Sequence, residues 1–315
     1  MPVSITKGKL TKEQINSLVN NAFGKNALNI VELTEGFFNI AYKVTLEGKE
    51  VVLKIAPSKE IAIMTHEKNI MFSDVSAMEK VAKETEVPVP AILFYDNSYT
   101  ILDREYFFME MLKGSSFSSL SDHMTEKQKD KIYYDTGRYT RMLNQIQGSR
   151  FGYYGQKEKQ GDNWYHVFYS MILDTYSDAE RKNIFIPAKK DKVISLLERD
   201  RAIFEAVKTP KFVHWDIWEG NVFVSENQIT GIIDFERCLW ADELMEFGFR
   251  TFRHHKAFFD GYGMTGLSKE EERRAKWYDI YLFLIWCLEC DYRMYDNRET
   301  YEHGSDMLKK WINML

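Results

Sequence analysis

Residues 212–236 read "FVHWDIWEGNVFVSENQITGIIDFE", and this stretch decides how the rest of the chain is interpreted. It holds His214, Asp216 and Asn221 in the spacing H-x-D-x4-N, followed by a predicted hairpin and then by Asp234. Asp234 follows an apolar run, so it ends a buried strand, where a carboxylate is costly unless a cation balances it. The pattern therefore predicts a polar site built from two neighbouring loops.

These residue types suit phosphoryl transfer. That reaction needs a carboxylate to receive and orient the attacking hydroxyl group, and it needs oxygen ligands for Mg²⁺. Asp216 fits the first task, and Asn221 and Asp234 fit the second. We therefore expect a magnesium-dependent reaction at this loop.

The remaining side chains of the loop are expected to support it. His214 is predicted to fix the loop backbone, and Trp215 and Trp218 are predicted to wedge the loop against neighbouring helices. For Trp218 and Glu219 two roles stay open, scaffolding of the loop and contact with the phosphate acceptor.

A lysine far upstream adds a second group. Lys54 lies in the apolar strand "VVLKI" (51–55), and Glu67 lies within the helical apolar pattern of residues 59–84. A carboxylate on the apolar face of a helix needs a partner, and Lys54 is the obvious candidate. Kinase folds use such a lysine–glutamate pair to direct an ammonium group at nucleotide phosphates.

The order of predicted elements indicates an α+β protein. Residues 29–112 show five strands, with one helix between the third and the fourth, whereas the chain beyond 113 is mainly helical. We therefore predict two lobes, residues 1–112 and 113–315, joined by a hinge at about 109–114.

Two motifs are interpreted as structural elements and not as binding or catalytic sites. Residues 261–266 match G-x-G-x-x-G, but their context is helical, so we expect a turn between helices and not a dinucleotide site. The C-x-x-C at 287–290 lies in the apolar run "YLFLIWCLEC", which predicts a buried helix and not a metal or redox site.

Composition narrows the classes of partner. Lys+Arg 42 against Asp+Glu 47 gives a net charge of -5, so nucleic acid is not expected, while a cationic ligand is compatible. The three cysteines suit a reducing compartment. The longest apolar run is far shorter than the roughly 20 residues that cross a bilayer, so we expect no membrane partner and a cytoplasmic protein. A monomer and a homodimer both stay open.

With these motifs in this order, the chain resembles the aminoglycoside phosphotransferase-like kinases, which include antibiotic, choline-type and small-metabolite kinases. The resemblance extends from about residue 25 to 260 and implies a bilobal protein-kinase-like fold. It also implies ATP and Mg²⁺ as cofactors, with GTP in place of ATP left open.

The resemblance assigns roles to residues. "GFFNIAYKV" (36–44) resembles the family's nucleotide loop, "VVLKI" its phosphate-binding strand, and "YFFMEMLKG" (106–114) the strand and hinge that hold adenine. The implied nucleotide-binding residues are Gly36, Asn39, Lys54, Glu67, Glu110 and Leu112.

"HWDIWEGN" (214–221) resembles the family's catalytic loop, which implies Asp216 as the catalytic base and Asn221 and Asp234 as magnesium ligands. In "WADELMEFGF" (240–249), Asp242 and Glu246 fall on two acids that help to support this loop, and Asp242 is the expected supporting residue. One departure is Trp215, where many members carry glycine.

The acceptor implied by the resemblance is a hydroxyl group of a small molecule, such as an aminoglycoside-like antibiotic or another amine or polyol. Acids that could bind a cationic acceptor are plentiful after residue 235: Glu236, Asp242, Glu243, Glu246, Asp279, Glu289 and Asp291. Two alternatives are a protein kinase, against which the chain lacks A-P-E, H-R-D and D-F-G motifs, and a nucleotide-binding regulatory protein, which would have lost a catalytic group.

Overall fold

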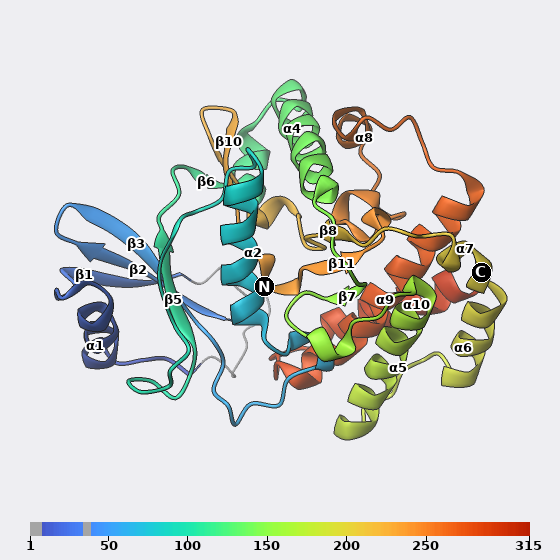
Figure 1. The fold of residues 1–315 in the computed structure, drawn as a ribbon, viewed down its shortest axis with the longest axis horizontal. Helices are drawn as coiled ribbons and strands as arrows, with labels where there is room; N and C mark the ends of the chain where they lie inside the picture. The colour runs from blue at the N-terminus through green and yellow to red at the C-terminus, as the bar shows by residue number, and fades with distance from the viewer. Residues whose placement is uncertain (1–7, 34–38) are drawn as a thin grey trace.

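The computed structural model describes residues 8–33 and 39–315 (Figure 1). The first part contains α1 (Lys12–Phe23), β1 (Asn29–Leu33), β2 (Ile40–Leu46), β3 (Lys49–Ile55), α2 (Ile70–Glu84), β4 (Ile92–Asp96) and β5 (Tyr106–Glu110). The second part contains β6 (Ser115–Ser116), α3 (Phe117–Leu120), α4 (Glu126–Gln145), β7 (Gly152–Tyr153), α5 (Trp164–Lys182), α6 (Lys190–Arg199), α7 (Arg201–Glu205), β8 (Lys211–Val213), β9 (Val222–Ser225), β10 (Gln228–Ile232), β11 (Leu239–Ala241), α8 (Lys256–Tyr262), α9 (Lys269–Tyr292) and α10 (Glu299–Ile312).

The five strands of the first part form one antiparallel sheet in the order β1-β2-β3-β5-β4, which confirms the predicted α+β class. Successive residues of β3 and β5 face opposite sides, as a pleated strand requires. Leu53 and Phe108 pack in one cluster with α1, whereas Val52 and Phe107 pack in another with α2. The sheet therefore lies between α1 and α2.

Helix α2 starts later than the apolar period predicts. The spacing suggested helix from about residue 59, but α2 begins at Ile70, after a 3-10 turn at Thr65–Glu67. Asn69 precedes the helix with a φ of 57°, in the left-handed region, so the chain changes direction there. Met64 is buried, but in the extended segment before this turn, because burial alone does not require helix.

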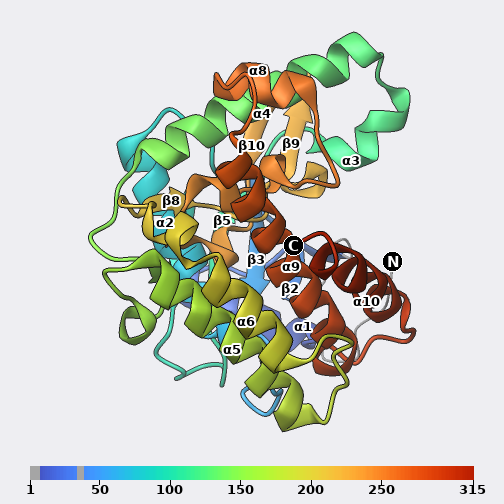
Figure 2. The ribbon, with the colours of Figure 1, turned by 90° about the vertical axis from the view of Figure 1, so that its right-hand side faces the viewer.

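The second part is built around α9, most of which is buried. Figure 2 shows α5, α6, α9 and α10 gathered in this part. The C-x-x-C cysteines Cys287 and Cys290 lie in α9 and are buried, which confirms the predicted buried helix. Gly263 ends α8 with a φ of 83°, so the G-x-G-x-x-G match is the predicted turn between helices.

Two small sheets carry the polar motifs of the second part. The chain leaves the large sheet at Glu110, and β6 then pairs with β9 in a sheet of order β10-β9-β6. The other sheet has the order β7-β11-β8. None of the helices in the described ranges combines the length and apolar character that crossing a bilayer requires.

Candidate active site

The loop that follows β8 is held by one buried carboxylate. Glu246 accepts hydrogen bonds from the backbone N–H groups of His214 (2.9 Å) and Trp215 (3.0 Å). Asn144 donates its side-chain amide to the same carboxylate at 3.0 Å. Burial raises the pKa of Glu246 to about 7. Of the two acids that the resemblance implied as supports, Glu246 therefore holds the loop backbone, whereas Asp242 pairs with Arg274.

His214 ties this loop to the strand end that carries Asp234. Its Nε2 lies 3.1 Å from the carbonyl oxygen of Ile233, and its Nδ1 accepts the backbone N–H of Asp216 at 3.2 Å. Burial lowers the pKa of His214 to about 4, so the ring is neutral at pH 7 and Nε2 is the donor. The predicted backbone-fixing role of His214 is borne out by these contacts.

Asp216 and Asn221 are fixed relative to each other. The side-chain amide of Asn221 donates to the backbone oxygen of Asp216 at 2.9 Å, and the backbone oxygen of Asn221 accepts the N–H of Ile233 at 3.1 Å. Burial raises the pKa of the Asp216 carboxyl group, while the guanidinium of Arg237 opposes that shift. A raised pKa makes the carboxylate a better proton acceptor.

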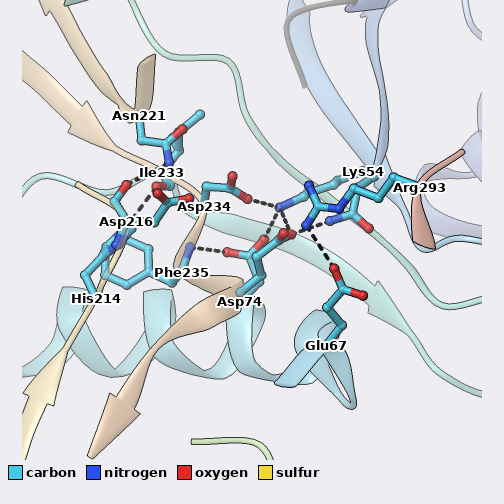
Figure 3. Close-up of polar contacts among 12 residues, drawn as sticks. Lys54, Glu67, Asp74, His214, Asp216, Asn221, Ile233, Asp234, Phe235 and Arg293 are labelled. Atoms are coloured by element: carbon cyan, nitrogen blue, oxygen red, sulfur yellow. Dashed lines mark hydrogen bonds and ion pairs between the residues drawn. The ribbon is translucent and has the colours of Figure 1, made fainter. Parts of the chain in front are cut away.

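Lys54 lies at the centre of a group of three carboxylates (Figure 3). Its Nζ is 2.6 Å from Asp74, 2.5 Å from Asp234 and 2.9 Å from Glu236. Burial opposes the charge of Lys54, but the three acids outweigh it and raise the lysine pKa well above its usual value. Burial together with the charge of Asp234 raises the pKa of Glu236 to about 8.

The predicted ion pair between Lys54 and Glu67 is wrong. Glu67 lies in the turn before α2, where it accepts the backbone N–H of Met64 at 2.8 Å and pairs with Arg293 at 2.9 Å. Figure 3 shows Asp74 at the position expected for Glu67, and Asp74 also accepts the backbone N–H of Phe235 at 2.8 Å. Once α2 starts at Ile70, the helical period itself selects Asp74, which lies four residues after Ile70 and four before Met78.

These groups share one cavity of about 470 Å³. Its wall includes the four predicted polar residues Lys54, Asp216, Asn221 and Asp234. Residues 109–112 form the part of the wall next to the large sheet. A cavity of this size matches a site for a small-molecule ligand. The structure thus brings together residues that are up to 180 positions apart in the chain.

Comparison with known proteins agrees with this geometry. The model of the phosphotransferase enzyme family, APH, matches residues 29–277. The chain belongs to this family. It is therefore a kinase that transfers phosphate to a hydroxyl group. Comparison with curated protein sequences gives no match.

Solved structures share the fold of this phosphotransferase over nearly its whole length. A protein assigned as a fructosamine-3-kinase from Haemophilus somnus 129PT is 16% identical, with a TM-score of 0.69 and coverage of 95% of this chain and 97% of that one. The streptomycin–ATP–APH(2″)-IIa ternary complex is 16% identical, with a TM-score of 0.64 and coverage of 97% and 99%. A thermostable mutant of APH(4)-Ia with AMP-PNP and hygromycin B is 15% identical, with a TM-score of 0.65 and coverage of 95% and 98%.

The structure also shows where other residues predicted for the site of this phosphotransferase lie. Gly36 lies outside the described residues. Asn39 lines the cavity, and its amide donates to the carboxylate of Glu236. Glu219 accepts the hydroxyl of Tyr133 at 2.7 Å and pairs with Arg253, which favours scaffolding over contact with an acceptor. Asp74 was not predicted from the sequence, and Glu236 was predicted only as an acid for a cationic acceptor, not as a partner of Lys54. The place of Glu236 directly after "DF" was the available signal.

The residues present fit a magnesium ion. Carboxylate oxygens of Asp74, Asp234 and Glu236 lie within 4.8 Å of one another, and Mg²⁺ prefers oxygen ligands of this kind. Burial and repulsion among these acids together raise the pKa of Glu236 to about 8, and a further cation would relieve that repulsion. Asp234 keeps 30% of its side chain exposed, and it lines the cavity.

Proposed function

We propose that the chain is an ATP- and Mg²⁺-dependent kinase that transfers the γ-phosphate to a hydroxyl group of a small molecule. The observation that carries the proposal is the shared cavity, in which the half-buried Asp216 lines the same space as Lys54 and Asp234. Family membership supports the reaction class, and nucleotide-bound complexes of similar fold support ATP as the donor. GTP stays a candidate for the donor.

Each residue receives a role in this proposal. Asp216 accepts the proton of the attacking hydroxyl and orients its oxygen, and burial makes it a better base for that task. Lys54 contacts the nucleotide phosphates from its position among the carboxylates. Asn221 and Asp234 would hold Mg²⁺, which neutralises phosphate charge when bound.

The nucleotide base is assigned to the sheet side of the cavity. Glu110 and Leu112 line it there, at the point where the chain passes from β5 to β6. We assign residues 109–114 as the hinge between lobes 1–112 and 113–315. Gly231 lies against this segment. A Cβ atom added at Gly231 would lie 2.4 Å from the side chain of Leu112, too close for any larger residue without a shift of that side chain.

Replacement of the base tests the proposal. We expect Asp216→Asn to lower the rate of phosphate transfer by at least about 100-fold, because a positioned general base contributes that much. The KM for ATP should stay nearly constant, since Asp216 is assigned to the acceptor. The measurement is transfer of labelled phosphate from ATP across a panel of hydroxyl compounds, including sugars, amino alcohols and aminoglycosides.

The matched control is Asp291→Asn, which removes a carboxylate from a partly exposed ion pair with Arg298. This variant should transfer phosphate at the wild-type rate. An Asp216→Asn protein that kept the wild-type rate would overturn the assignment of the base.

A further inference from the structure

The acids that the sequence offered for a cationic acceptor are engaged within the fold. Asp242 pairs with Arg274 at 2.6 Å, Glu243 with Lys211 at 2.5 Å and Asp291 with Arg298 at 2.7 Å. Asp279 accepts the N–H of Thr251 and the indole N–H of Trp311. Glu246 holds the loop backbone, Glu236 contacts Lys54, and Glu289 pairs with Arg237.

Among these seven acids, Glu236 alone lines the described wall of the cavity. The other acids on that wall, apart from the Lys54 group and Asp216, are Glu32 in β1 and Glu110 at the end of β5. Both belong to the large sheet, on the side assigned to the nucleotide base. Apart from the acids around Lys54, which the proposed function assigns to the nucleotide and Mg²⁺, the described wall therefore offers no acid beside Asp216 for an amine to bind.

Two arginines line this cavity instead. Arg237 follows Asp234 by three residues, and Arg293 lies at the end of α9. One oxygen atom, Oε1 of Glu289, lies 3.1 Å from Nη2 of Arg237 and 3.4 Å from Nη2 of Arg293. The two guanidinium groups are therefore close neighbours, held in place by a shared carboxylate.

The partners of the arginines lie behind them. Glu289 and Glu67 are buried and do not belong to the described lining, whereas Arg237 and Arg293 do. Figure 3 shows Arg293 reaching toward Glu67, with its contact at 2.9 Å. In each pair the arginine therefore lines the cavity and the acid does not. A guanidinium carries five N–H donors in a planar fork, which suits carboxylate and phosphate groups.

Arg237 is also close to the catalytic loop. Its guanidinium lies over the ring of Trp215 at 5.6 Å, and it is the main charge that stabilises ionised Asp216. An anionic group bound at Arg237 would hold its own molecule beside Asp216, where the attacking hydroxyl must lie. Cationic acceptors would meet two fixed positive charges at the same place.

We propose that Arg237 and Arg293 form an anion-binding subsite beside Asp216, and that the acceptor is a hydroxyl compound carrying a carboxylate or phosphate group. This inference rests on the proposed function, since it names the class of acceptor for the same site. It assigns an acidic polyol or hydroxy acid as the substrate class and disfavours polyamines.

The test uses four matched polyols with the full-length protein: D-gluconate, D-glucitol 6-phosphate, neutral D-glucitol and D-glucamine. Binding is measured by calorimetry with a non-hydrolysable ATP analogue and Mg²⁺ at saturation, so that the phosphate-binding part of the nucleotide site is filled. We expect at least one of the two anionic polyols to bind about tenfold or more tightly than glucitol, with glucamine the weakest. Which anion binds better distinguishes a carboxylate acceptor from a phosphorylated one.

Arg237→Gln should remove the preference for the anionic polyol. The double variant Arg237→Gln/Glu289→Gln should also lose this preference. In it the Glu289 carboxylate is removed together with its partner Arg237, so no buried charge is left unpaired by the loss of Arg237. The control is Arg298→Gln, which removes an arginine from a partly exposed ion pair and should bind all four polyols as the wild type does. Thermal unfolding of each variant reports whether it is folded. The comparison of the four polyols on the wild-type protein does not depend on any variant.

The inference is overturned if the wild type binds no anionic polyol, prefers glucitol or glucamine, or keeps its preference in folded Arg237→Gln protein. It is also overturned if the substitution weakens the nucleotide analogue alone, because the arginines would then belong to the nucleotide site. ATP turnover separates the two proposals. If the protein turns over ATP but does not prefer the anionic polyols, only this inference is overturned. If it prefers them but turns over no ATP, only the proposed function is overturned.

Discussion

Trp215 occupies a backbone conformation that favours glycine. Its φ is 71°, and a side chain in the left-handed region costs about 1–2 kcal/mol. Surrounding contacts hold it there, because the indole stacks on Tyr281 at 5.5 Å and meets His66 edge-on at 5.9 Å. The resemblance places glycine at this position in many family members, which suits the observed φ. In this chain the tryptophan adds packing against Tyr281 and His66, next to Asp216 in the sequence, at the expense of backbone strain.

This balance predicts an unusual order of stability. Trp215→Ala and Trp215→Gly should each lower the free energy of unfolding by about 3–5 kcal/mol, because a buried tryptophan is lost. We expect the glycine variant to be the more stable of the two by about 1 kcal/mol, since it alone relieves the strain. Trp218 is the control, because its φ of -92° is ordinary and alanine should be the more stable substitute there. Urea unfolding of the four variants measures both differences; a less stable Trp215→Gly would contradict the argument.

At the scale of elements, α2 shows what periodicity resolves and what it leaves open. The apolar runs and the turns between them predicted β2 and β3, and residues 40–46 do alternate between buried and half-buried positions, as on a pleated strand. The apolar residues before α2 misled the prediction of its start, since Ile63 and Met64 lie before the 3-10 turn and not in the helix. The wrong assignment of Glu67 as the partner of Lys54 followed from that misplaced start.

Long-range pairing is the part of the site that the sequence left open. The types and order of Lys54, Asp216, Asn221 and Asp234 follow from the chemistry, and the cavity brings them together. Which carboxylate pairs with which cation does not follow, because such pairs join distant segments. The pair of Glu67 and Arg293, for example, spans 226 positions.

The corrected pairing predicts different effects for two conservative changes. Asp74→Asn should raise the KM for ATP about tenfold or more and lower kcat, because Lys54 loses a charged partner and Phe235 loses a strong acceptor. Glu67→Gln should instead lower the free energy of unfolding by about 3–5 kcal/mol, as breaking a buried ion pair does. Its KM for ATP should change by less than about threefold. Steady-state kinetics beside urea unfolding separates the two; a kinetic defect confined to Glu67→Gln would restore the original prediction.

At the scale of the whole molecule, the turn before α2 joins the sheet-bearing part to the helical part. Thr65 donates its backbone N–H and its hydroxyl to the two carboxylate oxygens of Asp178 in α5, both at 2.7 Å. The amide of Gln156 donates to the backbone oxygen of Thr65 at 3.0 Å. Helix α2 is thus anchored at its start on one part of the molecule, while its apolar face packs against the sheet of the other. The position of Asp74 relative to Lys54 depends on both.

Thr65→Val tests whether this anchor positions the site. The change keeps the shape of the side chain but removes one hydrogen bond to a buried carboxylate, so unfolding should become easier by about 1–3 kcal/mol. Amide hydrogens in the first turn of α2 should exchange faster, and the KM for ATP should rise a few-fold because Asp74 is less firmly held. Thr140→Val is the matched control: Thr140 is equally buried, but its hydroxyl bonds the backbone of Thr136 within α4. Equal kinetics and equal α2 exchange in the two variants would show that the anchor contributes stability without positioning Asp74.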